Sequence, residues 1–344
     1  MSSLAPFPSA PPARLLRVSR ADVGAPILDL LEWGALVAPA DVATIDLTGP
    51  GAVACLQGLL TNDIEAPGDG SFVYGALLSP KGMIVVDAWA ARSGATVRLT
   101  VTLEGREAAV ALLARSVPPR LARIADRSGD FAAFRVAGPR ATQVVEAADL
   151  PLPEAAARVA ASDDLEVARG PDGAPFAFQV VVSRAGAAEL ERRLIRAGAT
   201  AAPPAALEVT RVLAGWPRLG AEVDAKTIPQ EVRFDEIGGV SYTKGCYTGQ
   251  ETVSRLHFQG HTNRELRGLE FDATPTTAGD ERPVVTLDER DVGRLTSVVE
   301  LPEDRCVGLA VLRREVGPGT VVRAGGPLAR VVPLPLSLRP PRPA

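Results

Sequence analysis

Several residue types are scarce in this chain, and each scarcity argues against a class of protein. Its 344 residues include three cysteines, two histidines and only three lysines. The sequence contains no G-x-G-x-x-G, G-x-x-x-x-G-K-[ST], C-x-x-C, H-E-x-x-H or G-x-S-x-G motif. These absences argue against a P-loop nucleotide hydrolase, an ordinary dinucleotide-binding enzyme and a hydrolase that needs a histidine base.

Long apolar runs are also missing. No segment reaches the ~18 consecutive apolar residues of a membrane span, and four prolines interrupt residues 1–20, where a signal peptide would lie. Cys55, Cys246 and Cys306 are odd in number and widely spaced, which is typical of free thiols in a reducing compartment. We therefore expect a cytoplasmic protein with no membrane partner.

Charge is balanced and evenly spread. Lys plus Arg number 37 against 41 Asp plus Glu, and no five like charges stand in a row. A general nucleic-acid binder needs a basic excess or stripe to displace counterions from phosphates. We therefore expect no nucleic-acid partner.

The residues that are present predict an α+β fold. Helical patterns at residues 51–60, 104–116, 140–147, 187–197 and 205–214 interleave with strand patterns at 84–90, 95–103, 131–137 and 176–182. Helices on one side of antiparallel strands are typical of split-βαβ units, and the pattern accommodates two of them. After residue 267 only short strands are predicted, at 268–271, 283–287, 292–299, 307–312 and 320–323, which indicates a small antiparallel barrel.

The expected organisation has four parts. Residues 1–20 and 332–344 are rich in proline, small residues and arginine, and we expect both to be mobile tails. Between them, the α+β region covers residues 21–260 and the C-terminal β-barrel covers residues 261–331.

One segment combines a cysteine with the features of a reactive loop. Gly245 and Gly249 bracket Cys246, and the Lys244 ammonium, two residues away, would favour a thiolate. The apolar neighbours of Cys55 and Cys306 instead predict burial. Taken alone, the residues also fit a structural cysteine in a turn, so both interpretations stay open. His257 and His261 lack nearby carboxylate or thiolate partners, and we expect no metal site.

The run from Lys244 to Glu251 resembles the K-G-C-Y-x-G-Q-E signature of the YgfZ family. Members of that family are folate-binding proteins that support iron–sulfur enzymes, and they are homologous to the aminomethyltransferase (T-protein) of the glycine cleavage system. Further blocks resemble the family in order: Leu56-Gln57-Gly58, Leu60-Thr61-Asn62-Asp63, Leu77 to Gly82, Gly215-Trp216-Pro217 and Ile228 to Glu231. The resemblance implies an aminomethyltransferase-like cloverleaf of two interleaved split-βαβ units plus the barrel.

The resemblance also implies a ligand, a role and partners. Tetrahydrofolate or a derivative would lie in a central cavity, and Cys246 with Lys244 would carry the activity. The implied cofactor-binding residues are Asn62, Asp63, Tyr74, Arg211, Tyr247, Gln250, Glu251 and Arg255. The implied role is an accessory one in assembly or repair of iron–sulfur clusters, with assembly factors or client iron–sulfur enzymes as partners. The alternatives are a tetrahydrofolate-dependent aminomethyl transferase, and a folate-fold binding module in which Cys246 is structural.

Two positions depart from the related aminomethyltransferases. Where they carry paired aspartates, this chain has Val85 and Val86 before Asp87, which predicts that aminomethyl transfer is lost. Where many relatives carry a glutamate that accepts hydrogen bonds from the pterin, this chain has Leu213, which cannot accept them.

Overall fold

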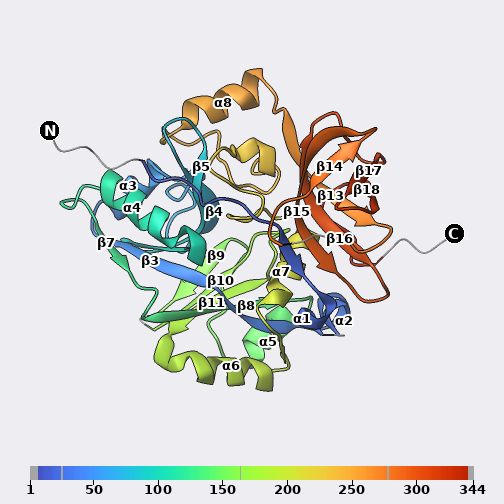
Figure 1. Cartoon of the computed structure of the whole chain (residues 1–344). Helices are drawn as coiled ribbons and strands as arrows, with labels where there is room; N and C mark the ends of the chain where they lie inside the picture. Colours follow the sequence, from blue (N-terminus) through green and yellow to red (C-terminus); the bar gives the residue numbers. More distant parts are fainter. Residues whose placement is uncertain (1–6, 25, 163, 277–278, 340–344) are drawn as a thin grey trace.

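A five-stranded antiparallel sheet, a six-stranded mixed sheet and a closed barrel form the three lobes of the molecule (Figure 1). The computed structural model describes residues 7–339 except residues 25, 163, 277 and 278. Within these residues the helices have at most 11 residues, and none is long and apolar enough to cross a membrane.

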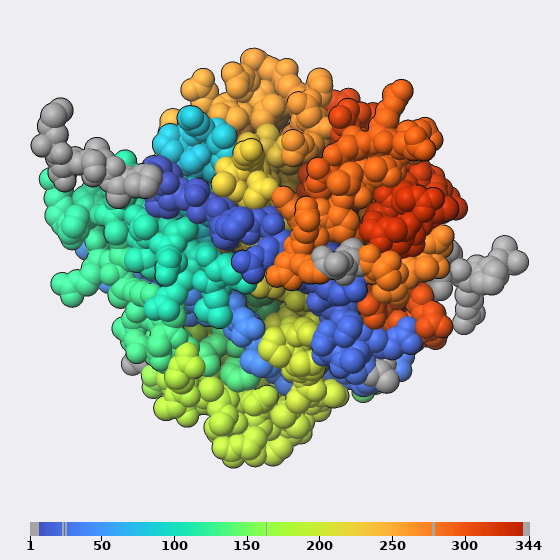
Figure 2. All heavy atoms as spheres, viewed as in Figure 1, coloured from blue at the N-terminus to red at the C-terminus, as the bar shows by residue number. Residues whose placement is uncertain are grey.

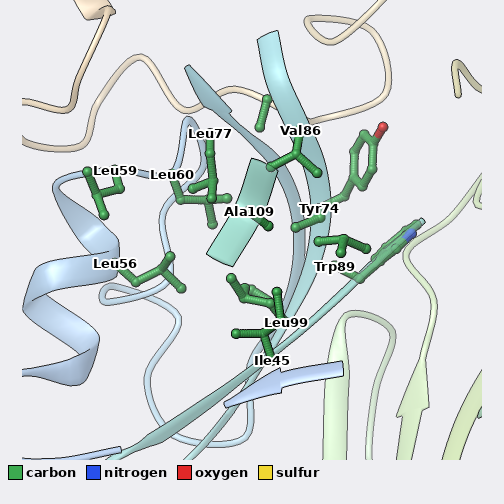
Figure 3. Packing of buried hydrophobic residues seen from close by; sticks show 14 of the residues in the cluster. Ile45, Leu56, Leu59, Leu60, Tyr74, Leu77, Val86, Trp89, Leu99 and Ala109 are labelled. Carbon is green, nitrogen blue, oxygen red and sulfur yellow. The ribbon is translucent and has the colours of Figure 1, made fainter. Parts of the chain in front are cut away.

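The first sheet has five strands in the order β4-β5-β6-β3-β7. Their bounds are β3 Val42–Thr48, β4 Phe72–Leu78, β5 Ile84–Ser93, β6 Thr96–Thr102 and β7 Arg123–Asp126. One face is covered by α3 (Ala52–Gln57) and α4 (Arg106–Ser116), and α4 buries Ala109, Leu112 and Leu113. Strand alternation sends Val86 to this helical side and Tyr74 and Trp89 to the opposite side (Figure 3).

The second sheet has six strands in the order β12-β2-β8-β11-β10-β9. Their bounds are β2 Leu36–Ala40, β8 Phe131–Ala137, β9 Arg158–Ala161, β10 Leu165–Arg169, β11 Phe178–Ser183 and β12 Thr200–Ala201. The helices α5 (Ala141–Ala147) and α6 (Ala187–Arg196) bury apolar residues against it.

The two sheets meet through buried polar side chains rather than apolar ones alone. Gln179 of β11 donates from Nε2 to Oγ1 of Thr100 on β6 at 3.0 Å. Arg98 of β6 pairs with Asp46 of β3 at 2.8 Å and lies 3.7 Å from Glu166 of β10. We call these contacts, with the cavity described below, the polar layer between the sheets.

The third lobe is a barrel of six antiparallel strands. They are β13 (Arg264–Phe271), β14 (Val284–Leu287), β15 (Arg290–Glu300), β16 (Cys306–Arg313), β17 (Val321–Ala324) and β18 (Leu328–Val332). The barrel closes because β16 pairs with both β13 and β15. Its interior is apolar, with Leu269, Leu295, Val298 and Leu312 fully buried.

The remaining elements connect the lobes. They are β1 (Leu16–Val18), α1 (Arg20–Val23), α2 (Ile27–Trp33), α7 (Ala205–Ala214), the 3-10 turn η3 (Pro229–Val232) and α8 (Gln250–Gln259). Helix α8 lies at the top of the view in Figure 1, and the chain passes from its end at Gln259 into the barrel at Arg264.

Both predicted tails differ from expectation over their described residues. Strand β1 pairs with β15 in parallel, and Ala10 is buried in the core of the first sheet. Figure 2 shows this N-terminal segment lying across the surface between the first lobe and the barrel. At the other end, Leu336 is buried and donates its N–H to the Leu213 carbonyl at 2.7 Å. Proline-rich chain can pack in this way because larger elements supply its hydrogen-bond partners. Residues 1–6 and 340–344 of the predicted tails lie outside the described residues.

The α+β fold with two sheet-and-helix units and a C-terminal barrel is confirmed. The predicted helices α3, α4, α5, α6 and α7 are all present, and α7 has the predicted bounds. The strands without a sequence prediction include β1, β7, β9 and β12, which have only two to four residues, and also the longer strands β3 and β4.

Candidate functional site

A cavity of about 200 Å³ lies between the two sheets and α7. We call it the central cavity. Its lining includes Tyr74, Asp87, Trp89, Thr100, Arg135, Phe176, Glu208, Arg211, Trp216 and Arg218.

One wall of the central cavity is aromatic. Tyr74 and Trp89 are cross-strand partners on β4 and β5, with ring centroids 5.0 Å apart. Trp216 stacks on Trp89 at 5.6 Å with 14° between the ring planes, and Phe176 meets the edge of Trp89 at 4.9 Å. Flat π-faces of this kind favour a planar, apolar-faced ligand.

Asp87 supplies a carboxylate to the same cavity. The Tyr74 hydroxyl donates to its Oδ2 at 3.0 Å, whereas its buried Oδ1 has no hydrogen-bond partner among the described residues. Burial raises the pKa of Asp87 above its ordinary value. Strand alternation turns Val86 toward the helices and Asp87 toward the cavity, so this stretch supplies the cavity with one carboxylate.

The opposite wall is built on one face of α7. Glu208 and Arg211 are three residues apart, so both side chains lie on the same side of the helix, and they pair at 2.7 Å. Burial alone would raise the pKa of Glu208, but Arg211 and Arg218 outweigh it and hold this pKa below its ordinary value. Burial lowers the pKa of Arg135 to about 10.

These residues fit the pterin head group of a folate. The unpartnered Oδ1 of Asp87 is positioned to accept a hydrogen bond from a ligand N–H, and the aromatic wall offers faces for stacking. The cavity is smaller than the ~300–1,000 Å³ typical of ligand sites. It therefore has room for a head group, with the rest of such a ligand outside.

Of the predicted cofactor-binding residues, Tyr74 and Arg211 line this cavity. Arg211 is already fully engaged, because its guanidinium also donates to the Trp216 carbonyl, to Glu222 and to Ser297 of the barrel. Its contacts tie α7 to the barrel, so Arg211 holds the cavity wall in place.

Three of the other predicted residues, Lys244, Cys246 and Tyr247, belong to a second region, which we call the cysteine loop (residues 239–249). It lies against the block that contains Leu60 and Thr61 and against the turn between β4 and β5. The Ser241 N–H donates to the Thr61 carbonyl at 3.0 Å, and the Thr248 N–H donates to the Gly58 carbonyl at 3.1 Å. Blocks that are nearly 200 residues apart in the sequence are thus in direct contact.

Lys244 is the main anchor of the cysteine loop. Its ammonium donates to the carbonyl oxygens of Gln57, Leu60 and Asn62 at 2.7, 2.6 and 2.8 Å. Burial lowers the pKa of Lys244 to about 8. All three N–H donors are used in these bonds, so none remains for the Cys246 sulfur, and the expected direct pairing of ammonium and thiolate is not observed.

Two glycines let the loop approach the β4–β5 turn closely. Both Gly82 (φ +84°) and Gly249 (φ +81°) adopt left-handed conformations. A Cβ on Gly249 would lie 2.6 Å from the Ser79 carbonyl oxygen, and a Cβ on Gly82 would lie 2.7 Å from Thr252. The close contact between the cysteine loop and the β4–β5 turn therefore explains why Gly82 and Gly249 are glycines.

The three cysteines have different environments, and none forms a disulfide. Cys246 is exposed on the cysteine loop, Cys55 is half-buried, and Cys306 is buried in the barrel. Burial raises the pKa of Cys306 to about 12. The predicted burial is thus found for Cys306 and only in part for Cys55.

Asn62 and Asp63 organise the backbone beneath the loop. Asn62 donates from Nδ2 to the carbonyls of Tyr74 and Gly238, at 2.8 and 2.7 Å. Asp63 accepts the N–H groups of Glu65 and Ala66, each at 2.9 Å. Asn62 therefore links the strand that carries Tyr74 to the start of the cysteine loop.

The last four predicted residues also lie outside the central cavity lining. Tyr247 belongs to the cysteine loop, but its side chain is buried in the core, and its hydroxyl has no hydrogen-bond partner among the described residues. Gln250 and Glu251 begin α8, and Arg255 is exposed on that helix. The predicted set is thus divided between two regions.

The sequence reasoning missed the cavity residues Glu208, Arg135 and Phe176. Glu208 carried a usable signal, because Arg211 follows it by three residues on a predicted helix. Arg135 and Phe176 reach the cavity only when the two sheets pack together, which no local pattern reveals.

The comparisons with known proteins agree with this fold. Residues 35–237 match the family described as the GCVT N-terminal domain. The aminomethyltransferase T of Bartonella henselae superposes with a TM-score of 0.76 at 20% identity, covering 90% of this chain and 88% of that one. The fold is thus that of an aminomethyltransferase.

Sequence relatives come from two groups. The Aminomethyltransferase of Rubrobacter xylanophilus is 31% identical over 311 residues, which cover 85% of this chain and 80% of that protein. The tRNA-modifying protein YgfZ of Vibrio atlanticus is 34% identical over 135 residues, 37% of this chain and 42% of that protein. The match to this YgfZ relative therefore spans about two fifths of its length. The chain belongs to the GCVT family, and the predicted resemblance to YgfZ proteins is confirmed.

Proposed function

We propose that this protein binds a reduced folate in the central cavity and serves in assembly or repair of iron–sulfur clusters, acting through Cys246 in the cytoplasm. The observation that carries the proposal is the position of the one exposed thiol. It projects from a loop fixed to the β4–β5 turn, and β4 and β5 also supply Tyr74 and Asp87 to the cavity. The state of the cavity and the presentation of the thiol thus depend on the same two strands.

The folate part rests on the chemistry of the cavity. Tetrahydrofolate would supply a carrier for a one-carbon unit when bound. Asp87 would accept N–H groups of the pterin, and Tyr74 would hold the Asp87 carboxylate through its hydroxyl. Trp89, Trp216 and Phe176 would stack on the ring and exclude water from it. Leu213 lines a separate cleft beside Leu336, so pterin recognition here would rely on Asp87.

The iron–sulfur part rests on Cys246. A cluster usually takes four thiolate ligands, and among the described residues no group of three or more His, Cys, Asp or Glu is placed to hold a metal ion. The cluster would therefore be cargo, with the remaining ligands supplied by a client enzyme or an assembly factor. An exposed, rigidly held thiol is suited to such a shared contact.

A second candidate is tetrahydrofolate-dependent aminomethyl transfer. Asp87 in the cavity favours it, because proton transfer beside a folate nitrogen needs a carboxylate. It leaves the exposed Cys246 and the anchored loop without a role, so we rank it second.

Two measurements test the proposal. Calorimetric titration with tetrahydrofolate should give a binding heat that Asp87→Asn weakens, and absence of heat with every reduced folate would refute folate binding. Complementation of a deletion strain with impaired iron–sulfur enzymes should succeed with the native chain and with Cys306→Ala but fail with Cys246→Ala. Full rescue by Cys246→Ala would refute the role of the thiol. Aminomethyl transfer from a lipoyl carrier by the native chain would favour the second candidate instead.

A further inference from the structure

A groove lined by residues on both sides of Cys246 in the sequence lies where the barrel meets the α+β body. It consists of two adjoining hollows of about 540 and 570 Å³, which share Arg264 and Arg313. Lys226 lines the first hollow and Arg314 the second. We call Lys226, Arg264, Arg313 and Arg314 the basic groove.

The two shared arginines face each other across a strand pair. Arg264 on β13 is the register partner of Arg313 on β16, and both side chains point away from the barrel interior. Like charges directly opposite in an antiparallel pair repel each other and destabilise the sheet. This placement weakens the barrel unless an anion lies between the two guanidinium groups.

No described carboxylate forms a close ion pair with both guanidinium groups. Arg264 has no hydrogen bond or ion pair with any described residue, although its charge interacts with that of Glu231. Arg313 lies 4.0 Å from Glu315, and its charge also interacts with that of Asp291. Three acidic residues of the first hollow already have arginine partners: Asp224 with Arg282 at 3.0 Å, Asp291 with Arg294 at 2.7 Å and Glu222 with Arg211 at 2.9 Å. The fourth, Glu231, accepts the Ile228 N–H at 3.4 Å and interacts with the charge of Arg264. Six basic and five acidic residues line the two hollows, and one of the acidic residues, Glu222, is paired with Arg211 outside the lining. The basic groove therefore keeps a small excess of positive charge.

We propose that the basic groove is a binding site for a small ligand with adjacent oxyanion groups, either a diphosphate or a short run of carboxylates. Two arginine forks side by side match oxyanions in bidentate geometry. The first hollow has the volume of a small-molecule site. The positive charge is local, because the chain as a whole carries a net charge of −4, which favours a small anion over a long polyanion. This site does not depend on the folate or cluster chemistry proposed above.

Calorimetric titration of the full chain at low salt tests the site, with inorganic pyrophosphate and triglutamate as the two probes. We expect one probe to bind with a single-site isotherm, and the probe that binds identifies the source of the oxyanions. Arg264→Ala and Arg313→Ala should each weaken binding by about tenfold or more. The matched control is Arg330→Ala, an exposed arginine on β18 of the same barrel, which should leave affinity unchanged.

Removing one charge without reversing it separates this site from a merely structural role. Arg264→Gln relieves the repulsion across the strand pair, so it should not lower the melting temperature of the ligand-free protein while it weakens binding. Absence of heat with both probes would overturn the proposal. So would a loss of affinity in Arg330→Ala equal to that in Arg264→Ala, or a single-stranded RNA that binds more tightly than either probe.

Discussion

The polar layer between the sheets and the cysteine loop are built by opposite means. In the polar layer, side chains pair with side chains in the interior: Arg98 with Asp46, Tyr74 with Asp87, and Glu208 with Arg211. In the cysteine loop, one ammonium and several N–H groups bind backbone carbonyls, and two glycines permit the close contact. A single substitution in the polar layer can therefore change the charge or hydrogen bonding of the cavity. The backbone contacts of the cysteine loop instead fix the position of Cys246.

The largest expected difference concerns thiol reactivity. The thiolate is the form that reacts, and a pKa of about 12 leaves Cys306 about one part in ten thousand thiolate at pH 8. We expect iodoacetamide to label the exposed Cys246 at least about 100-fold faster than Cys306 at this pH. Mass-spectrometric mapping against time measures both rates. Equal labelling of the two cysteines in the folded protein would contradict the separation of their environments.

We expect the polar layer to make the free energy of unfolding depend on pH. Burial raises the pKa of Glu166 to about 7, above the 4.5 of an unfolded glutamate. The unfolded chain therefore loses this proton first, and the contribution of Glu166 to the free energy of unfolding falls as pH rises from 4.5 to about 7. Glu166→Gln removes that loss. Relative to the native chain it should be neutral near pH 4 and stabilising by up to about 3 kcal/mol near pH 8.

Denaturant unfolding across this pH range measures the difference, and Glu146→Gln provides a control. Glu146 is exposed on α5, so its substitution should leave the pH profile unchanged. If the difference in the free energy of unfolding between Glu166→Gln and the native chain were the same at pH 8 as at pH 4, Glu166 would not be the source of this pH dependence.

The stability of the protein should depend more on Lys244, the anchor of the cysteine loop, than on an exposed lysine nearby. Lys244→Met keeps an apolar stem but removes three hydrogen bonds from the carbonyls of Gln57, Leu60 and Asn62. Because water can reach part of this site, we expect a loss of about 2 kcal/mol in the free energy of unfolding. Lys81→Met changes an exposed lysine on the neighbouring β4–β5 turn and should cost almost nothing. Equal effects of the two substitutions would show that Lys244 is not the anchor.

The same contrast explains how far the sequence could predict the structure. The helix at 205–214 and the barrel strands follow from local periodicity, which survives folding. The signature from Lys244 to Glu251 correctly marked an exposed cysteine, yet the Lys244 ammonium turned toward carbonyls contributed by α3 and the turn after it. The sequence alone does not say whether Val86 or Asp87 faces the cavity, because strand alternation allows only one of them; the structure places Asp87 there. Contacts across the two sheets, such as Gln179 with Thr100, have no local signal.

Cys246→Ser is expected to have the smallest effect on stability, and it gives the sharpest test of the contrast between the polar layer and the cysteine loop. Cys246 is exposed, so Cys246→Ser removes no packing and should change the free energy of unfolding by less than about 0.5 kcal/mol. Under the proposed function it should still abolish support of iron–sulfur enzymes, because the hydroxyl of serine is a poor ligand and nucleophile beside a thiolate. Thermal unfolding and complementation measured on the same variant separate the two effects. A loss of stability as large as that of Lys244→Met would mean that Cys246 is part of the loop's framework, and the structural interpretation of the cysteine would then account for both observations.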